Sequence, residues 1–595
     1  MESKIVEKVN GYGTRIAYFS MEVGLTEDIP TYSGGLGILA GDTLKAGTDL
    51  QLPILGVTLL HEKGYFVQKL DGDGNQSEEP VDWNPSSFME LLPNIVQVNI
   101  EGREVNVRAW RYWIDGLTGN KVPLYFLDTN LEENSDADRG ITTYLYGGDE
   151  EYRLKQEVVL GIGGVRILRS MGFDDLATFH MNEGHASLLT LELLRENKKS
   201  LEEVWYEEAM WDPAMVKDLC VFTTHTPVPA GHDRFSKDLV KKILGRKDDR
   251  LSDKDGWLIN DIPLKVVEQF CGEEDFHMTL LALNLSRYAN GVAKKHGELS
   301  KEMFPEYEID SITNGVHVRT WASDPFQKLF DKYLQGWKSD SFLLRHAGCI
   351  SNKEIWKAHT DCKQQLLDYV KEKTTIELAP EVLTIGFARR ATTYKRADLL
   401  FSDIDRLVKI AQEAGKFQLI FAGKAHPKDE PGKDLIRRIF GYAKELSGKI
   451  PIIYLEHYNI SLGRLLTSGV DVWLNTPTRP LEASGTSGMK ATLNGVLNFS
   501  VLDGWWIEGH TEGITGWSIG PKPEGLTTMD NSSEIDANDL YEKLEKSVIH
   551  RYYNDKNKWV EMMKDALSIN GSFFSTNRMM LQYISSAYLR KSIKK

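Results

Sequence analysis

Short apolar runs recur along the first half of the chain, and they predict buried strands. These runs occupy residues 16–19, 55–60, 122–127, 177–180 and 221–224. Residues 95–110 alternate between apolar and polar side chains about Glu101-Gly102, which predicts a β-hairpin. Residues 154–171 carry apolar side chains at helical spacing and predict a long helix. Strands that alternate with helices indicate βαβ units and a mostly parallel sheet.

The second half repeats this alternation more regularly. Its predicted strands are residues 383–388, 419–422, 452–455, 470–474 and 496–501. Helical patterns at 399–414 and 434–446 lie between them, so we expect an α/β protein with two doubly wound, Rossmann-like domains that face each other across a cleft. The polar and aromatic stretch 320–340 marks the transition. We therefore place the first domain, with its hairpin insertions, at 1–318 and the second at 319–595, with the last helix a candidate to pack back on the first.

Composition narrows the class of protein. The 595 residues are 41% hydrophobic and 26% charged, as in a soluble globular protein of two or more domains. The formal charge of −15 disfavours nucleic-acid binding, but it is compatible with a neutral polymer or a small anion. Four widely spaced cysteines indicate neither zinc nor a disulfide framework. Because we find no signal-peptide core and no apolar run of membrane-spanning length, we expect a cytoplasmic protein with no membrane partner.

Residues 479–490, RPLEASGTSGMK, form what we call the glycine corner, between a predicted strand and a predicted helix. Small residues there let backbone N–H groups approach a phosphate or sugar hydroxyls closely. One lysine, Lys490, follows in an otherwise small and apolar setting. Such a lysine is either a Schiff-base amine or a solvated surface residue. The residues alone leave both interpretations open.

Residues 387–396, FARRATTYKR, form what we call the anion corner. Its cations cluster at the carboxyl end of a predicted strand, and a position in a crevice favours phosphate binding over a solvated basic face. Other positions carry weaker signals. Taken alone, the glycines near residue 35 turn the chain, Asn314-Gly315 is a turn, and His225 is a core histidine.

The glycine corner, with Leu493-Asn494-Gly495 and Leu502-Asp503-Gly504 after it, resembles the pyridoxal-phosphate lysine motif of the α-glucan (glycogen, starch, maltodextrin) phosphorylases, in a short form. The resemblance extends from Tyr18 to about Gly509. It implies a glycosyltransferase with two Rossmann-like domains and pyridoxal 5′-phosphate (PLP) on Lys490. Its implied partners are α-1,4-glucan and inorganic phosphate, which would give α-glucose 1-phosphate with retention. It implies no metal and leaves a homo-oligomer open.

The resemblance also implies roles for individual residues. Substrate phosphate would be held by Arg389, Arg390 and Lys395, beside His225 at the reacting glucose. The cofactor would be held by Lys490, Thr486, Ser487 and Tyr458. The glucan would contact Glu482, Ser484, Gly485, Asn314, His185 and Glu183. A glycine loop that contains Gly34, Gly35 and Gly37 would face the substrate phosphate through the helix that it opens.

Three departures from the longer members put local contacts in question. They are Thr392-Thr393 in place of His-Glu, Ser487-Gly488 in place of Gly-Asn, and Asn459 in place of an arginine near the cofactor phosphate. The short connection between Glu22 and Gly34 leads us to expect no N-terminal regulatory arm. We therefore expect no phosphorylation switch and no activation by AMP.

Three rival functions remain to be weighed. A nucleotide-sugar glucosyltransferase shares the architecture, the cations and the glutamate, but it lacks the PLP lysine. A PLP enzyme acting on amino acids has an aspartate-anchored layout that this chain lacks. A catalytically silent glucan-binding protein is disfavoured by the intact cations and lysine.

Overall fold

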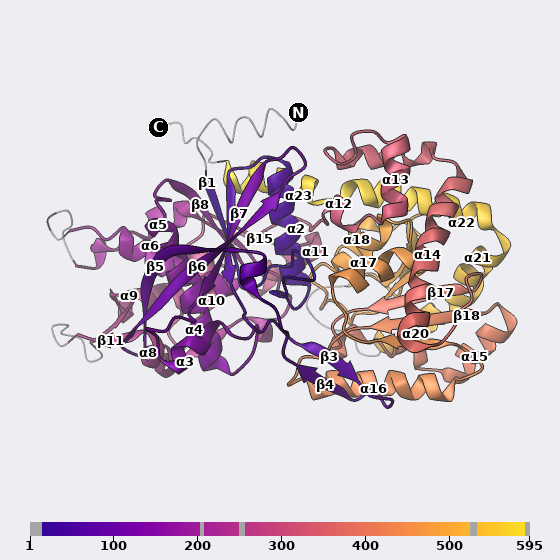
Figure 1. Cartoon of the computed structure of the whole chain (residues 1–595), viewed down its shortest axis with the longest axis horizontal. Coiled ribbons are helices and arrows are strands. Elements are labelled where there is room, and N and C mark those ends of the chain that lie inside the picture. Colours follow the sequence, from indigo (N-terminus) through magenta and orange to yellow (C-terminus); the bar gives the residue numbers. More distant parts are fainter. Residues whose placement is uncertain (1–14, 201, 203–206, 249–255, 524–531, 590–595) are drawn as a thin grey trace.

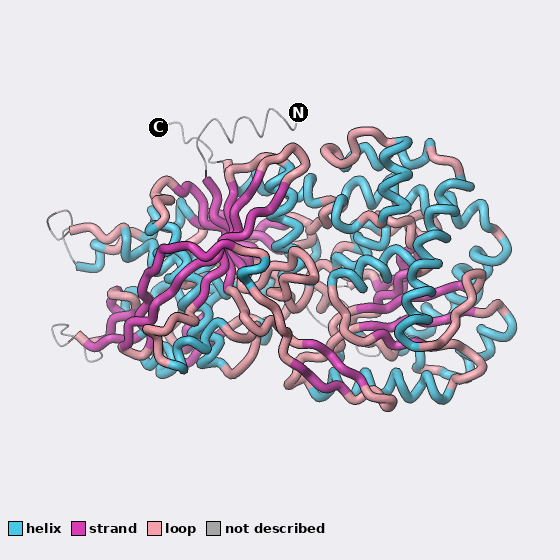
Figure 2. The backbone as a smooth tube through the Cα atoms, viewed as in Figure 1, coloured by secondary structure: helices cyan, strands magenta, loops and turns pink. Residues whose placement is uncertain are grey.

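The computed structural model describes residues 15–200, 202, 207–248, 256–523 and 532–589. A nine-stranded sheet lies within the first half and a six-stranded sheet within the second, each with helices packed around it (Figures 1 and 2). Smaller sheets are formed by three sets of strands: β3 Val67–Leu70 with β4 Gln76–Glu79, β10 Arg234–Ser236 with β14 Asp275–His277, and β11 Gly245–Lys247 with β12 Trp257–Ile259 and β13 Ile262–Pro263. The mixed α/β class with large parallel sheets is therefore confirmed.

The nine-stranded sheet has the order β16-β15-β9-β8-β1-β2-β7-β6-β5. All of its strands run parallel except where β6 pairs with β7 and β5, so the antiparallel hairpin forms one edge. The turn is at Glu101-Gly102, where both residues have positive φ as a tight hairpin requires. The strands are β1 Arg15–Ser20, β2 Ile54–Leu59, β5 Glu90–Ile100, β6 Arg103–Asp115, β7 Lys121–Asp128, β8 Leu176–Asn182, β9 Cys220–Thr223, β15 Tyr288–Gly291 and β16 Asp310–Ser311.

The helices of the first half connect and cover these strands. The helix predicted at 154–171 begins earlier in the structure, at Glu150, where Asp149 caps α4. A π-helical turn, Val159–Gly163, then joins α4 to α5. The helices are α2 Gly35–Asp49, α3 Asp136–Arg139, α4 Glu150–Val158, α5 Gly164–Ser170, α6 Leu189–Glu196, α7 Pro213–Leu219, α8 Lys237–Leu244, α9 Leu264–Cys271, α10 Met278–Asn284 and α11 Lys294–Met303.

The six-stranded sheet is parallel throughout, in the order β19-β18-β17-β20-β21-β22. The chain adds β18 and β19 on one side of β17 and then returns to add β20 on the other, so a crevice opens between the carboxyl ends of β17 and β20. The first sheet has the same kind of switch between β1 and β8. The strands are β17 Leu383–Ala388, β18 Phe417–Ala422, β19 Ile452–Leu455, β20 Val472–Asn475, β21 Leu497–Val501 and β22 Gly516–Ile519.

The helices of the second half begin in the predicted transition stretch. They are α12 Val318–Trp321, α13 Asp324–Tyr333, α14 Asn352–Thr374, α15 Ile404–Glu413, α16 Glu430–Glu445, α17 Ile460–Gly469, α18 Thr486–Thr492, α19 Trp506–Gly509, α20 Ser532–Lys543, α21 His550–Asn554, α22 Lys556–Asp565 and α23 Thr576–Tyr583. Among the described residues, no helix combines the length and the apolar character needed to cross a bilayer.

Two segments tie the halves together. The hairpin β3 Val67–Leu70 and β4 Gln76–Glu79 leaves the first half and lies along α16 (Figure 1), where Gln68 Nε2 donates to the Gly423 carbonyl at 2.8 Å. At the other end of the chain, α23 and the turn after it share a hydrophobic cluster with β1 and α2. There His180 Nδ1 lies 2.7 Å from the Tyr588 hydroxyl.

Candidate active site

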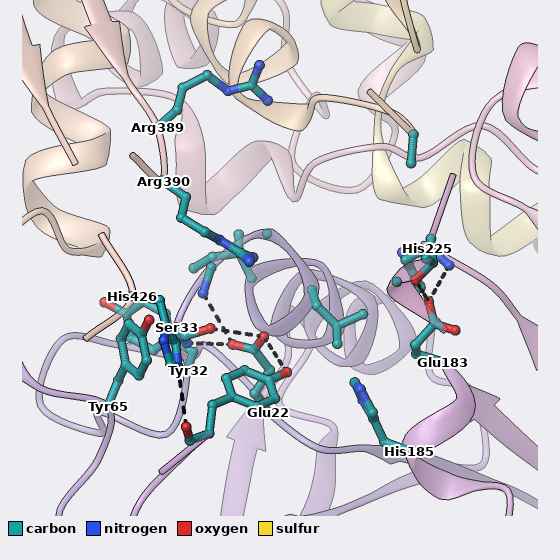
Figure 3. A pocket seen from close by; sticks show the side chains of 18 of the residues that line it. Glu22, Tyr32, Ser33, Tyr65, Glu183, His185, His225, Arg389, Arg390 and His426 are labelled. Carbon is teal, nitrogen blue, oxygen red and sulfur yellow. Dashed lines mark hydrogen bonds between the residues drawn. The ribbon is translucent and has the colours of Figure 1, made fainter. Parts of the chain in front are cut away.

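A cavity of about 1230 Å³ lies where the carboxyl ends of both sheets meet. Every predicted site residue lines it except Gly37. The glycine corner, the anion corner and Tyr458 come from the second half, whereas the glycine loop, Glu183, His185 and His225 come from the first. Figure 3 shows Arg389 and Arg390 on one side of this space and Glu183, His185 and His225 on another. The cavity is therefore built from two walls that are distant in sequence.

The glycine corner presents Lys490 from α18 as a buried amine. Gly485 precedes the helix with φ +86°, a left-handed conformation that glycine adopts without strain. Lys490 is 7% exposed, and its Nζ lies 3.7 Å from the centre of the Trp321 ring. Burial lowers the pKa of Lys490 to about 8; the cations of Arg389 and Lys45 add to this, and Asp42 opposes it. The solvated-lysine interpretation is therefore wrong.

The anion corner places two cations on one carboxylate of the glycine corner. Arg389 Nη1 lies 2.8 Å from Glu482 Oε2, and Lys395 Nζ donates to the same oxygen. Burial raises the pKa of Glu482, but the charges of Arg389 and Lys395 outweigh it and lower that pKa to about 2. Arg390, the third cation, extends from the end of β17 toward the glycine loop (Figure 3). The anion corner therefore holds more positive charge than Glu482 alone balances.

The glycine loop already binds a protein carboxylate. Glu22, just after β1, accepts hydrogen bonds from the Ser33 and Gly34 amides and from the Tyr146 hydroxyl. A Cβ at Gly37 would lie 2.7 Å from Glu22 Oε2, so this glycine makes room for the carboxylate instead of lining the cavity. Gly34 and Gly35 do line it. The positive potential at the start of α2 is therefore partly neutralised by a carboxylate of the protein itself.

His225 is held neutral and in one tautomer. Asn182 donates its amide hydrogen to Ser20 Oγ, so its Oδ1 accepts from His225 Nε2 at 2.6 Å. The proton on Nε2 leaves Nδ1 as an acceptor. Burial, together with nearby histidines, lowers the pKa of His225 to about 3. Its backbone N–H donates to Glu183 Oε2 at 2.6 Å.

Glu183 has a backbone conformation that side-chain-bearing residues rarely adopt, with φ +76°. Its carboxylate accepts from its neighbour Gly184, from the His225 backbone and from the Thr226 hydroxyl. Burial raises the pKa of Glu183. Residues held in sparsely populated conformations cluster at functional sites, so the strain supports a site here.

His185 belongs to a charged cluster that the sequence did not indicate. Its Nε2 lies 2.7 Å from Arg153 Nη2 and 3.2 Å from Asp233 Oδ2. Glu157, His185 and Asp233 offer ligand-type atoms within 4.8 Å of one another, but the Arg153 guanidinium contacts all three side chains. Burial opposes ionisation of Asp233, yet His185 and Arg153 lower its pKa. The positive charge among these three side chains is therefore supplied by the Arg153 guanidinium.

The remaining predicted residues offer polar groups to the cavity. Ser484 Oγ and Asn314 Oδ1 are buried without a hydrogen-bond partner within the described part of the chain. Buried polar atoms are normally paired, so both are placed for a ligand. Burial raises the pKa of Tyr458 to about 12, which keeps its hydroxyl protonated. Ser487 also lines the cavity, and its Oγ accepts from the Trp473 indole.

Sequence reasoning missed several cavity residues. Lys424 and His426 follow the carboxyl end of β18. The rule that ligands bind at the carboxyl ends of parallel strands, which found the anion corner, could have found them as well. The others come from loops and helix faces: Tyr32, Tyr65, Tyr146, Arg153, Asp233 and Trp321. No local pattern in the sequence marks these, because only the tertiary fold brings them together.

Comparison with known proteins agrees with this geometry. A family model described as carbohydrate phosphorylase matches residues 129–514. The chain is 39% identical to the maltodextrin phosphorylase of Thermococcus litoralis, over 96% of this chain and 70% of that protein. It is 38% identical to the glycogen phosphorylase of Mycobacterium tuberculosis, over 97% of this chain and 71% of that protein. It is 37% identical to the glycogen phosphorylase of Aquifex aeolicus, over 97% of this chain and 86% of that protein.

Proposed function

The chain belongs to the carbohydrate phosphorylase family, and on that premise we propose that it is a PLP-dependent α-1,4-glucan phosphorylase. It would use inorganic phosphate to cleave the non-reducing end of glycogen or maltodextrin and release α-D-glucose 1-phosphate. We assign its two Rossmann-like domains to residues 1–318 and 319–595, facing each other across the cavity. The strand order of the second sheet, with its switch between β17 and β20, supports this assignment.

One observation carries the proposal. The same cavity is lined by the amine of Lys490 and by the cations Arg389, Arg390 and Lys395. It also contains Ser484 Oγ and Asn314 Oδ1, which have no hydrogen-bond partner among the described residues and could bind sugar hydroxyls. A glycosidase would need two carboxylates flanking the scissile bond. Here the carboxylate nearest the cations, Glu482, is held ionised by Arg389 and Lys395 and is poorly suited to donate a proton. Clustered cations instead suit a reaction in which phosphate is the attacking group.

The residues present fit PLP. Lys490 is a buried amine whose lowered pKa, about 8, gives it a larger neutral fraction near neutral pH than a solvated lysine has, and it would be the residue that holds the cofactor. Arg389 lies close enough to influence that pKa, and it supplies a positive charge for the cofactor phosphate. Thr486, Ser487 and Tyr458 line the same part of the cavity. When bound, PLP would supply a phosphate that exchanges a proton with the substrate phosphate.

The anion corner would bind and orient inorganic phosphate. Arg390 and Lys395 line the cavity with N–H donors, and Lys395 is buried, so its charge acts there more strongly than it would in water. A phosphate oxygen then bonds to the anomeric carbon as the glycosidic bond breaks, and the departing glucan oxygen takes a proton from that phosphate. No other nucleophile is needed, because retention follows from phosphate attacking on the face the glucan leaves.

Groups from both walls would orient the sugar. His225 Nδ1 is an acceptor for a glucose hydroxyl, because its Nε2 proton is committed to Asn182. Asn314 Oδ1 and Ser484 Oγ supply further hydrogen-bonding groups. Glu482 would accept from sugar hydroxyls while the Arg389 and Lys395 charges keep it ionised. Neutral polar groups and a carboxylate held by two cations favour an uncharged polyol at these positions.

The experiment measures glucose 1-phosphate release from a maltooligosaccharide by the PLP-loaded protein, with and without inorganic phosphate. A parallel reaction offers a nucleotide-glucose and the same oligosaccharide. We expect release that requires phosphate, and no elongation from the nucleotide sugar. Elongation without phosphorolysis would instead support the glucosyltransferase rival, and binding without either reaction would support the silent glucan-binding protein.

A further inference from the structure

A buried carboxylate outside the cavity joins its two corners. Asp536, on α20, has 0% of its surface exposed. Its Oδ2 accepts from Arg396 Nη2 at 2.6 Å and its Oδ1 accepts from Arg479 Nη2 at 2.7 Å. Each oxygen therefore binds a different arginine, and the carboxylate bridges the two.

Each arginine belongs to one corner of the cavity. Arg396 follows Lys395 directly, in a left-handed conformation with φ +46°, and its guanidinium also donates to the Thr476 and Pro477 carbonyls at 2.9 and 2.7 Å. Arg479 is the first residue of the glycine corner. Asp536 thus connects the end of the anion corner with the start of the glycine corner, where Lys395 and Glu482 meet.

The surrounding backbone makes room for this bridge. Gly520, just after β22, has φ +66°, and a Cβ there would lie 2.0 Å from Asp536 Oδ1 and 2.6 Å from Arg479 Nη1. Its backbone N–H donates to Asp539 on the same helix, α20. The chain therefore comes as close to the Asp536–Arg479 pair as a glycine permits.

The bridge is also unbalanced in charge. Two buried guanidiniums share one carboxylate, so removing that carboxylate leaves two like charges with little access to water. Burial lowers the pKa of Arg396, and the Asp536 charge opposes that change. Without Asp536 the two arginines would repel each other, and the corners that carry them would separate.

We infer that Asp536 is a positioning residue for the anion corner: it fixes Arg396 against Arg479 and thereby holds Lys395 and its neighbours in the geometry that binds inorganic phosphate. This inference rests on the proposed function, since phosphate is the substrate assigned to that corner. Asp536 touches no substrate, so its effect is on phosphate affinity and not on the glucan.

The same sheet offers a matched control at its opposite edge. Asp471, just before β20, is also buried and binds two basic side chains, with Lys363 Nζ at 2.6 Å and His359 Nε2 at 2.8 Å. It lies at the amino ends of the strands, away from both corners. Asp471→Asn therefore removes a comparable buried carboxylate without disturbing the cavity.

The test titrates inorganic phosphate into PLP-loaded wild type, Asp536→Asn and Asp471→Asn by calorimetry, and records thermal unfolding of each. We expect both variants to unfold at lower temperature, but only Asp536→Asn to bind phosphate more weakly, by about tenfold. In turnover assays the KM for phosphate should rise while the KM for the glucan stays within about twofold. Calorimetry needs no turnover, so a missing phosphorylase activity would be recognised separately.

Unchanged phosphate affinity in Asp536→Asn, or equal weakening in both variants, would overturn the inference. If Asp536→Asn does not fold, Arg479→Lys takes its place, because it keeps the charge and loses the two-pronged reach to Asp536 and the Ile519 carbonyl. We expect a smaller loss of phosphate affinity in the same direction. Wild-type affinity in that variant would likewise contradict the role of the bridge.

Discussion

The two walls of the cavity differ in charge although both are built from strand ends. The wall from the first half presents Glu183, His185 and His225, together with Glu22 at the glycine loop. The wall from the second half presents Arg389, Arg390, Lys395 and Lys490. Burial lowers the pKa of His225 to about 3, so this histidine adds no positive charge to the first wall near neutral pH. The comparison indicates that the second wall attracts anions more strongly than the first.

Glu482 is an exception to this difference in charge between the walls. It is a carboxylate on the cationic wall, and its lowered pKa of about 2 is set by Arg389 and Lys395 against the cost of burial. Because it compensates two cations, Glu482 reduces the attraction of this wall for an anion. On the proposed function it would also accept hydrogen bonds from a sugar. Changing the charge of single residues on either wall should therefore separate these effects.

The largest expected effect comes from removing the amine of the cationic wall. Lys490→Ala should abolish phosphorolysis and covalent PLP attachment, because Lys490 is the amine that α18 presents to the cavity. Borohydride reduction and mass spectrometry of the peptides identify the labelled lysine. Lys424→Met is the control, since Lys424 also lines the cavity and burial also lowers its pKa to about 8. A labelled Lys424 in the wild type would contradict the assignment.

Arg390→Met should lower kcat/KM for phosphate by about a hundredfold or more, as expected when a charged donor to a developing anion is lost. Steady-state rates at varied phosphate measure this change. Lys428→Met removes an exposed cation that donates to the Gly148 carbonyl but does not itself line the cavity, and it should change the rate little. Equal losses in the two variants would mean that general positive charge, and not the anion corner, attracts phosphate.

Glu482→Gln should have opposite effects on the two substrates. Loss of the carboxylate frees Arg389 and Lys395, so inorganic phosphate should bind several-fold more tightly, while turnover falls because the sugar loses an acceptor. Calorimetry with phosphate and rates with maltooligosaccharide give the two values. Weaker phosphate binding in this variant would show that Glu482 positions the cations more than it neutralises them.

The smallest expected effect concerns pH. Because its pKa is lowered to about 3 by burial, His225 stays neutral from pH 5 to pH 8 and should contribute no step to the activity profile there. His225→Asn should lower kcat by about tenfold through lost hydrogen bonding, with the acid limb unmoved. Profiles of the two proteins measured in the same buffers test this. An acid limb near pH 6 that disappears in the variant would show that His225 titrates during turnover.

Much of the second sheet could be predicted because its strands are buried on both faces and appear as uninterrupted apolar runs. The strand predicted at 383–388 matches β17. The strand predicted at 470–474 begins only at Val472, because α17 ends at Gly469 and Val470 follows it. The rule that ligands gather at strand ends placed the anion corner correctly in the cavity.

Other features had no local signal. The hairpin β3–β4 reaches the second half through Gln68 and Gln76, whose hydrogen bonds go to backbone atoms more than 300 residues away. The cluster of Arg153, His185 and Asp233 likewise depends on three separate segments. The capture of the glycine-loop amides by Glu22 could not be foreseen either, because glycine spacing indicates space for an anion and not which anion fills it.

The most direct test of the two-wall account follows the oxygen atoms. PLP-loaded protein is incubated with maltooligosaccharide and inorganic phosphate labelled with ¹⁸O at every oxygen, and the glucose 1-phosphate is examined by mass spectrometry and NMR. The account predicts an α-anomeric product that keeps all of the phosphate oxygens, including the one that bridges to the sugar. A product whose bridging oxygen is unlabelled, or release of free glucose alone, would contradict it.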